Sequence, residues 1–168
     1  MEKISNDIMK SITIKNISKD NRKDINEFLV TNWYTTDMAV RGKIFDMTVL
    51  DGFVAYDKNK IIGLVTYLKE KDEYEIMSLD SLVENKGIGT ALVNKVVEKA
   101  REDKSKKVKL ITTNDNMNAI KFYQRRGFDL VRLYRNAVEA SRKLKPSIPL
   151  NGDFNIPIKH ELEFEMEL

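Results

Sequence analysis

The chain has 168 residues, of which 42% are hydrophobic and 33% charged, and these values are typical of one folded domain over residues 1–168. Its 29 basic and 26 acidic side chains leave a net charge of +3, which is too balanced to predict nucleic-acid binding. The sequence has no cysteine and one histidine, which excludes disulfides, thiol nucleophiles and the usual cysteine or histidine metal sites.

The first half of the chain moves from a helical pattern to extended ones. Ile8–Ile17 is expected to form a strand, and Asp20–Trp33 a helix because its apolar residues recur at helical spacing. Tyr34–Leu50 shows no clean period, so we expect an irregular loop with at most one helical turn. Three strands are then expected over Phe53–Tyr56, Ile61–Leu68 and Glu73–Leu79. The middle one is apolar on both faces, which predicts that it lies between two layers.

The second half alternates between helices and strands, which predicts a three-layer α/β domain. In the final strand, apolar residues alternate with glutamates, which predicts one buried face and one acidic, solvated face, and the strand could pair across a homodimer. We expect His160 and this acidic face to be structural. The expected elements are a helix over Ile88–Lys104, a strand over Val108–Thr112, a helix over Asn116–Arg126, a strand over Phe128–Tyr134, a helix between Asn136 and Pro146, and the final strand His160–Leu168.

The turn Glu84–Thr90, with the sequence Glu-Asn-Lys-Gly-Ile-Gly-Thr, lies between a predicted strand and an amphipathic helix. A helix that begins at a glycine-rich turn offers unpaired N–H groups and the positive end of its dipole to an anion. No Lys-Ser or Lys-Thr pair follows the last glycine, as a Walker loop requires, and a dinucleotide fingerprint would need a third glycine near Leu92. On its own, the turn also fits a helix start that binds no ligand.

A second segment, Asn116–Phe128, resembles the second signature of the GNAT superfamily of N-acetyltransferases. Gly87 and Gly89 match the phosphate-binding motif of the same superfamily, and the two motifs occur in the expected order. Glu84 stands where the family usually has Gln or Arg, so backbone amides rather than this side chain are expected to bind pyrophosphate. The resemblance covers Val54–Tyr134, and residues beyond it resemble a bacterial subgroup whose acceptor is not assigned. The matching residues of the second signature are Asn116, Ala119, Phe122, Tyr123, Gly127 and Phe128.

The resemblance implies the GNAT-like fold, a mixed and mostly antiparallel sheet with helices on both faces, and acetyl-CoA as acyl donor. Leu79–Ser81 would separate from the neighbouring strand and offer backbone groups to the pantetheine arm, and the Leu79 N–H would polarise the thioester carbonyl. Asn116 would bond the arm or the phosphates, and Tyr123 would protonate the departing thiolate. The amides expected to hold the pyrophosphate belong to Asn85, Lys86, Gly87, Ile88, Gly89 and Thr90.

The general base is assigned from the residues themselves. Glu73 and Glu75 would share a strand face with Met77 and Leu79, and so point towards the thioester site. Partial burial there would raise a carboxylate pKa into a useful range, and Glu75 is preferred because it lies deeper in the strand. A surface or salt-bridged role for Glu75, and a water chain as base, stay open.

Acceptor recognition is expected from Tyr34–Leu50 and from the loop before the last strand, because loops often carry specificity. Trp33 and Arg41 are the assigned substrate-binding residues, although Trp33 also fits core packing and Arg41 a loop anchor. The leading hypothesis is acetyl transfer from acetyl-CoA to a primary amine, small or peptide, by direct attack in a ternary complex. A non-catalytic acyl-CoA-binding or sensor module is the alternative.

The partners and the compartment follow from absences in the sequence. No apolar run approaches the length that spans a bilayer, and Met1–Asp7 lacks the apolar core of a signal peptide. We therefore expect a cytoplasmic protein with no membrane partner and no metal. Basic residues gather at Lys104–Lys109 and from Arg125 onward. They can form a solvated face or a binding surface for a polyanionic small molecule. A nucleic-acid binder that uses the residues after Arg125 is the weakest alternative.

Overall fold

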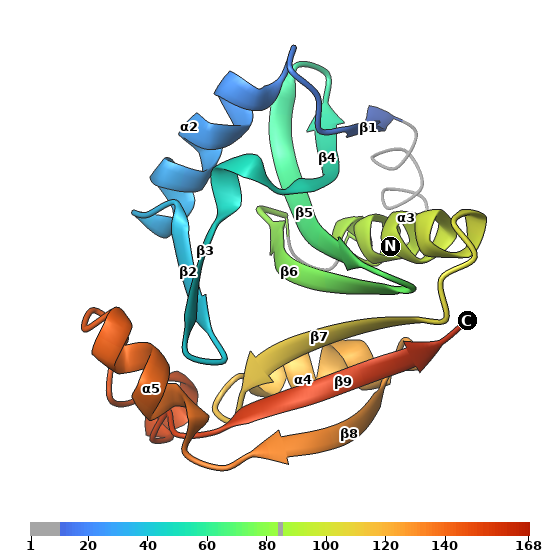
Figure 1. Cartoon of the computed structure of the whole chain (residues 1–168). Helices are drawn as coiled ribbons and strands as arrows, with labels where there is room; N and C mark the ends of the chain where they lie inside the picture. Colours follow the sequence, from blue (N-terminus) through green and yellow to red (C-terminus); the bar gives the residue numbers. More distant parts are fainter. Residues whose placement is uncertain (1–10, 84–85) are drawn as a thin grey trace.

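The computed structural model describes residues 11–83 and 86–168, and its centre is a mixed sheet. The strands of this sheet are β1 (Ile12–Asn16), β4 (Asp51–Asp57), β5 (Lys60–Glu70), β6 (Glu73–Ser81), β7 (Lys107–Thr113), β8 (Asp129–Tyr134) and β9 (Glu161–Glu167). The helices are α2 (Arg22–Trp33), α3 (Ile88–Glu102), α4 (Met117–Gln124) and α5 (Ala137–Leu144). The strand order is β1-β4-β5-β6-β7-β9-β8, and every neighbouring pair is antiparallel except β6 and β7. Helices cover both faces, as expected (Figure 1).

Strand β5 lies between two hydrophobic clusters, as its apolar residues on both faces predicted. Val65 packs on the side of α3, and Leu64 packs on the opposite side with Ile25 and Leu29 of α2. Each of these four side chains is fully buried, and burying one such side chain contributes about 1.5–3 kcal/mol. The apolar stripe of α3 is buried against the sheet in the same way. Both helical layers are therefore held by the apolar residues from which these elements were predicted.

The segment expected to be an irregular loop contains a hairpin formed by β2 (Asp37–Val40) and β3 (Lys43–Asp46), followed by a 3₁₀ turn over Met47–Val49. The expectation was right for the single helical turn and wrong for the hairpin. Each strand has only 4 residues, which is too short for alternation to show in the sequence. Arg41 and Gly42 form the turn with φ of 50° and 64°, the positive values that a two-residue hairpin turn requires.

The final strand β9 is an inner strand of the sheet, because it pairs with β7 on one edge and with β8 on the other. The expectation that this strand pairs across a homodimer was therefore wrong. The expectation of an acidic, solvated face was also wrong at its first residue, because Glu161 is only 3% exposed. Elements from elsewhere in the chain cover this end of β9, and they give Glu161 the surroundings described below.

Candidate active site

The two halves of the sheet separate between β6 and β7. Within the described residues, the parallel pairing of these strands runs from Glu73 and Lys107 to Ile76 and Leu110 and goes no further. Beyond that point the two strands diverge, as the resemblance implied for Leu79–Ser81 (Figure 1). A cavity of about 520 Å³ lies there, lined by both strands, by the β2–β3 hairpin and by α4.

Two backbone N–H groups of β6 point into this separation. The Leu82 N–H donates to the Ile62 carbonyl of the neighbouring β5 at 2.9 Å. Successive N–H groups of a strand alternate between its two edges, so those of Ser81 and Leu79 point away from β5. Both residues line the cavity. The predicted cofactor-binding residues Leu79 and Ser81 are thus brought to the opening with their donors facing it.

A bulge in β6 changes which residues share a face. Met77 is an extra residue in this strand, and no β5 residue stands opposite it. The extra residue reverses the alternation of the side chains beyond it. Ile76 and Leu79 therefore both pack on the side of α3, whereas Glu75 points to the opposite face. The expectation that Glu75 and Leu79 share a face was wrong.

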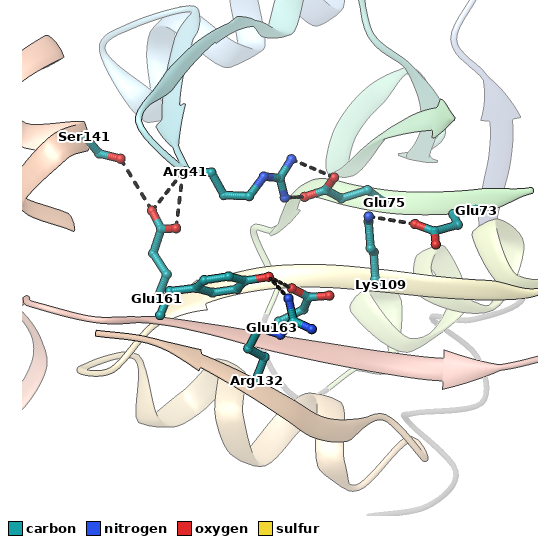
Figure 2. A network of polar contacts seen from close by, with 9 residues as sticks. Arg41, Glu73, Glu75, Lys109, Arg132, Ser141, Glu161 and Glu163 are labelled. Atoms are coloured by element: carbon teal, nitrogen blue, oxygen red, sulfur yellow. Dashed lines mark hydrogen bonds and ion pairs between the residues drawn. The ribbon is translucent and has the colours of Figure 1, made fainter. Parts of the chain in front are cut away.

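Glu75 forms a partly buried ion pair with Arg41, which lies at the turn of the β2–β3 hairpin (Figure 2). The two guanidinium Nη atoms of Arg41 bond the two carboxylate oxygens of Glu75, and Nη2 lies 3.0 Å from Oε2. Glu75 is 5% exposed, and its hydrogen bond raises the pKa of Arg41. The salt-bridged alternative for Glu75 and the loop-anchor alternative for Arg41 agree with this geometry. Among the described residues, neither side chain is part of the cavity lining.

Glu161 lies in the wall of the cavity and was not predicted as a site residue. Its Oε1 and Oε2 accept from the Arg41 backbone N–H at 3.0 and 3.2 Å, and Oε1 accepts from Ser141 Oγ at 3.4 Å (Figure 2). Burial raises the pKa of Glu161, although these hydrogen bonds oppose the shift. The sequence gives its position in an alternating strand but not the hairpin turn and the α5 hydroxyl that cover it.

Tyr123 is held in the cavity wall by the packing of α4. Its ring meets those of Phe122 and Phe128 edge-on, with centroids 5.0 and 5.4 Å apart. Burial raises the pKa of the Tyr123 phenol well above its ordinary value, so the group stays protonated at neutral pH. Asn116 also lines the cavity, and its Oδ1 accepts from the Ala119 N–H at 3.0 Å as the N-cap of α4.

The start of α3 faces a cluster of basic side chains from α4 and from the segment directly after it. Gly87 precedes the helix with φ of 77°, a value that a glycine adopts without strain. A second cavity of about 470 Å³ joins this turn to the basic residues. Helix N-termini and clustered cations both favour an anion, so the geometry suits a phosphate group. The residues of the turn, of α4 and of the segment directly after α4 that line this cavity include Gly87, Ile88, Gly89, Thr90, Lys121, Arg125 and Arg126.

Arg125 and Arg126 belong to the basic run that was noted in the sequence as a possible site for a polyanionic small molecule, whereas Lys121 was missed. Arg126 is fixed in place: its Nε donates to Thr90 Oγ1 at 2.9 Å, and its guanidinium stacks 3.4 Å from the Phe122 ring centroid. Lys86 lies in this turn directly before Gly87 and is half-buried. The predicted ligand Asn85, and Glu84 beside it, lie outside the described residues.

Trp33, a predicted substrate-binding residue, lines the cavity at the end of α2. Its Nε1 donates to Asp80 Oδ1 at 2.8 Å. Asp80 Oδ2 is buried and has no hydrogen-bond partner within residues 11–83 and 86–168. Burial raises the pKa of Asp80 to about 6, because the charged form loses its water.

Replacing Asp80 with asparagine is expected to increase the free energy of unfolding at neutral pH by about 1–3 kcal/mol, since one pKa unit corresponds to roughly 1.4 kcal/mol. The folded-state pKa of about 6 lies above the ordinary value of 3.8, so the folded protein binds this proton more tightly. The resulting stabilisation is complete below the unfolded pKa and is lost as the pH rises through 6.

Urea unfolding of the wild type and Asp80→Asn at several pH values measures this effect. The two proteins should be about equally stable near pH 4, and the variant should become the more stable one between about pH 5 and 7. The asparagine Oδ1 still accepts from Trp33, so that hydrogen bond is held constant. A stability difference that does not vary with pH would contradict the prediction.

The single histidine has a structural contact: His160 Nδ1 accepts from the Asn136 backbone N–H at 2.9 Å. The described residues contain no group of three His, Asp or Glu side chains able to hold a metal ion. No helix in the part of the chain that the structure describes is long and apolar enough to cross a membrane.

Comparisons with known proteins identify relatives of this sequence and fold. Residues 19–128 match the sequence model of the acetyltransferase (GNAT) family. The chain is 50% identical over 145 residues to the uncharacterized protein YxbD of Bacillus subtilis. The matched region covers 86% of this chain and 91% of that protein.

Solved structures of acetyltransferases have the same fold. The IAA acetyltransferase from Bacillus cereus ATCC 14579 has a TM-score of 0.71 at 20% identity, covering 94% of this chain and 100% of that one. A GNAT family acetyltransferase from Elizabethkingia anophelis with acetyl-CoA bound has a TM-score of 0.67 at 21% identity, with coverage of 94% and 99%. The expected fold class is thereby confirmed.

Proposed function

The chain belongs to the acetyltransferase (GNAT) family, and from that premise we propose that it is an N-acetyltransferase. It would move the acetyl group of acetyl-CoA to a primary amine, small or peptide, by direct attack in a ternary complex. One observation carries this proposal: the separation of β6 and β7 holds two inward-facing N–H groups and a buried, protonated tyrosine in one cavity. The sequence contains no cysteine, so transfer through an acyl-cysteine intermediate is excluded, which favours direct attack.

Acetyl-CoA supplies, when bound, a thioester whose carbonyl carbon is open to attack by an amine. The residues of this chain fit such a donor at both ends. Lys121, Arg125 and Arg126, together with the start of α3, suit its phosphate groups. Gly89 lines both cavities, and a Cβ there would lie 3.4 Å from the Phe122 ring, at van der Waals contact.

The proposed chemistry uses donors that are already oriented. The Leu79 N–H points into the opening, where a hydrogen bond to the acyl oxygen would stabilise the negative charge that develops during attack. Tyr123 stays protonated at neutral pH, which suits a general acid for the departing sulfur. Glu75 is occupied by Arg41 outside the cavity lining, so we no longer assign it the role of base.

The proposal is tested by measuring binding and turnover separately. Acetyl-CoA at about 100 times its Kd should stabilise the fold by about 2.7 kcal/mol, which is measured as a rise in melting temperature. A panel of primary amines, including alkylamines, aromatic amines and short peptides, is then screened for release of free thiol. Thiol release that requires both substrates supports the transferase. Stabilisation by acetyl-CoA without thiol release for any amine would favour the binding or sensor module.

A further inference from the structure

Glu161 differs from Glu73 and Glu75, two other carboxylates of the polar network in Figure 2, by the groups that it contacts. Glu73 pairs with Lys109 at 2.7 Å, and Glu75 pairs with Arg41. The hydrogen-bond donors to Glu161 are uncharged: the backbone N–H of Arg41 and the hydroxyl of Ser141. Within residues 11–83 and 86–168, Glu161 forms no ion pair at 4 Å or less. It is therefore a buried carboxylate whose charge is not matched by a bonded cation.

The positive charge that acts on Glu161 is that of Arg41, and Glu161 shares it with other carboxylates. The guanidinium of Arg41 is attracted by three carboxylates, Glu75, Glu161 and Glu163, and Glu75 already holds it by two hydrogen bonds. A buried carboxylate in such surroundings is costly unless a cation reaches it. Since Glu161 lines the cavity, that cation can come from a ligand.

The other elements packed around Glu161 contribute neutral groups. Helix α5 places Ser141 against it, while Thr113 of β7 and Tyr134 of β8 stand opposite it in the sheet. The preceding His160 is held through Nδ1 by a backbone N–H. Burial has the largest effect and raises the pKa of this carboxylate, as does Glu75, whereas Arg41 and the hydrogen bond from Ser141 lower it.

The position of Glu161 relates it to the proposed chemistry. The same cavity is lined by Leu79 and Tyr123 from the side of β6 and α4, and by Glu161 and Val40 from the side of β9 and the hairpin. An amine placed between these walls contacts a carboxylate on one side and faces the proposed acyl site on the other. Alkylamines are ammonium ions at neutral pH and must lose a proton before they can attack.

We propose that Glu161 receives the acceptor as an alkylammonium ion and removes its proton, an assignment that rests on the proposed transferase function. An N–H bond of the ammonium breaks, and its proton moves to the Glu161 carboxylate and then to solvent. The freed electron pair of nitrogen forms a bond to the acyl carbon. The C–S bond breaks with its electron pair going to sulfur, which takes the phenolic proton of Tyr123. The excess proton on the new amide nitrogen then restores the phenol.

The substitution Glu161→Gln tests this role, because the amide keeps the shape and accepts hydrogen bonds but cannot remove a proton. With an alkylamine near pH 7, we expect kcat/KM for the amine to fall by about 10²–10⁴-fold. With an aromatic amine, which is already neutral at this pH, the loss should stay below about tenfold, because no ammonium proton has to be removed. Raising the pH should narrow the loss for the alkylamine as more of it deprotonates in solution.

Controls separate catalysis from structure. Glu163 lies on the same strand, and its carboxylate accepts a hydrogen bond from the Tyr134 hydroxyl. Glu163→Gln should leave kcat/KM unchanged for both amines. The rise in melting temperature caused by acetyl-CoA should be the same for Glu161→Gln and the wild type. If the glutamine variant does not fold, Glu161→Asp is used instead. It keeps the charge, so it should lower kcat/KM by a similar factor for the alkylamine and the aromatic amine.

The outcomes distinguish this inference from the proposed function. If the wild type binds acetyl-CoA and releases no thiol with any amine, the proposed function fails and the inference fails with it. If the wild type is active and Glu161→Gln is equally active, or loses the same factor for both amines at every pH, only the role of Glu161 is overturned. If the aromatic amine is not a substrate of the wild type, the alkylamine alone decides the question. A loss of kcat/KM in Glu161→Gln that narrows as the pH rises supports the role of Glu161, and a loss that does not change with pH overturns it.

Discussion

Replacing Tyr123 with phenylalanine is expected to lower kcat by about 10²–10⁴-fold while acetyl-CoA binding changes by less than about twofold. The substitution removes only the hydroxyl, so the edge-on contacts of the ring with Phe122 and Phe128 are kept. The departing sulfur then lacks the proton donor that burial holds in the protonated form. Stopped-flow or steady-state thiol release gives kcat, and the melting temperature with and without acetyl-CoA reports binding.

Tyr74→Phe is the matched control for this prediction. Tyr74 is also buried, but its hydroxyl donates to Asp103 Oδ2 at 2.6 Å and it is not part of the cavity lining in the described residues. Its loss should reduce stability by about 0.5–1.5 kcal/mol and leave kcat unchanged. A Tyr123→Phe enzyme with the turnover of the wild type would show that the sulfur departs without a proton from this residue.

The elements with long, regular patterns were predictable because their signal is local. The apolar stripe of α3 and the two apolar faces of β5 need no knowledge of distant residues, and both are found as expected. The β2–β3 hairpin carries little local signal, since its strands are short and its turn has Arg41 at a position that usually favours Asn or Gly. Its conformation is fixed by contacts with β6, β9 and α5, which lie far away in the sequence.

The same distinction applies to the site. The glycine turn before α3 and the segment around Tyr123 could be recognised because each is a continuous run of residues. The assignment of Glu75 depended on strict alternation along β6, and one extra residue at Met77 reversed it. Glu161 could not be found from its own strand, because the hairpin turn and Ser141 bury it. A site built from distant segments is visible only once those segments are placed.

The β2–β3 hairpin links the two halves of the separated sheet through one residue. The side chain of Arg41 bonds Glu75 on β6, and its backbone N–H bonds Glu161 on β9 (Figure 2). Gly42 adds a bond from its N–H to Ser141 Oγ of α5 at 3.3 Å. The hairpin thus spans the opening between β6 and β7 by contacting β6 on one side and β9 on the other, and it positions the wall in which Glu161 lies.

Replacing Arg41 with methionine is therefore expected to lower the free energy of unfolding by about 2–4 kcal/mol, because it leaves the buried carboxylate of Glu75 without its cation. The value lies towards the lower part of the range for buried pairs, since the Arg41 side chain is 30% exposed. Urea unfolding near neutral pH measures the change. Lys95→Met, which breaks the exposed pair with Glu98, is the control and should cause no measurable loss.

The double variant Arg41→Met with Glu75→Gln should recover about 1–3 kcal/mol of that loss, because the amide removes the unpaired charge. Glu75→Gln alone should keep kcat within about threefold of the wild type, since an ion pair outside the cavity lining is not expected to carry the 10²–10⁴-fold effect of a general base. Additive losses in the double variant would mean that the two side chains act independently. A loss of turnover in a stably folded Glu75→Gln enzyme would return the role of base to Glu75 and remove it from Glu161.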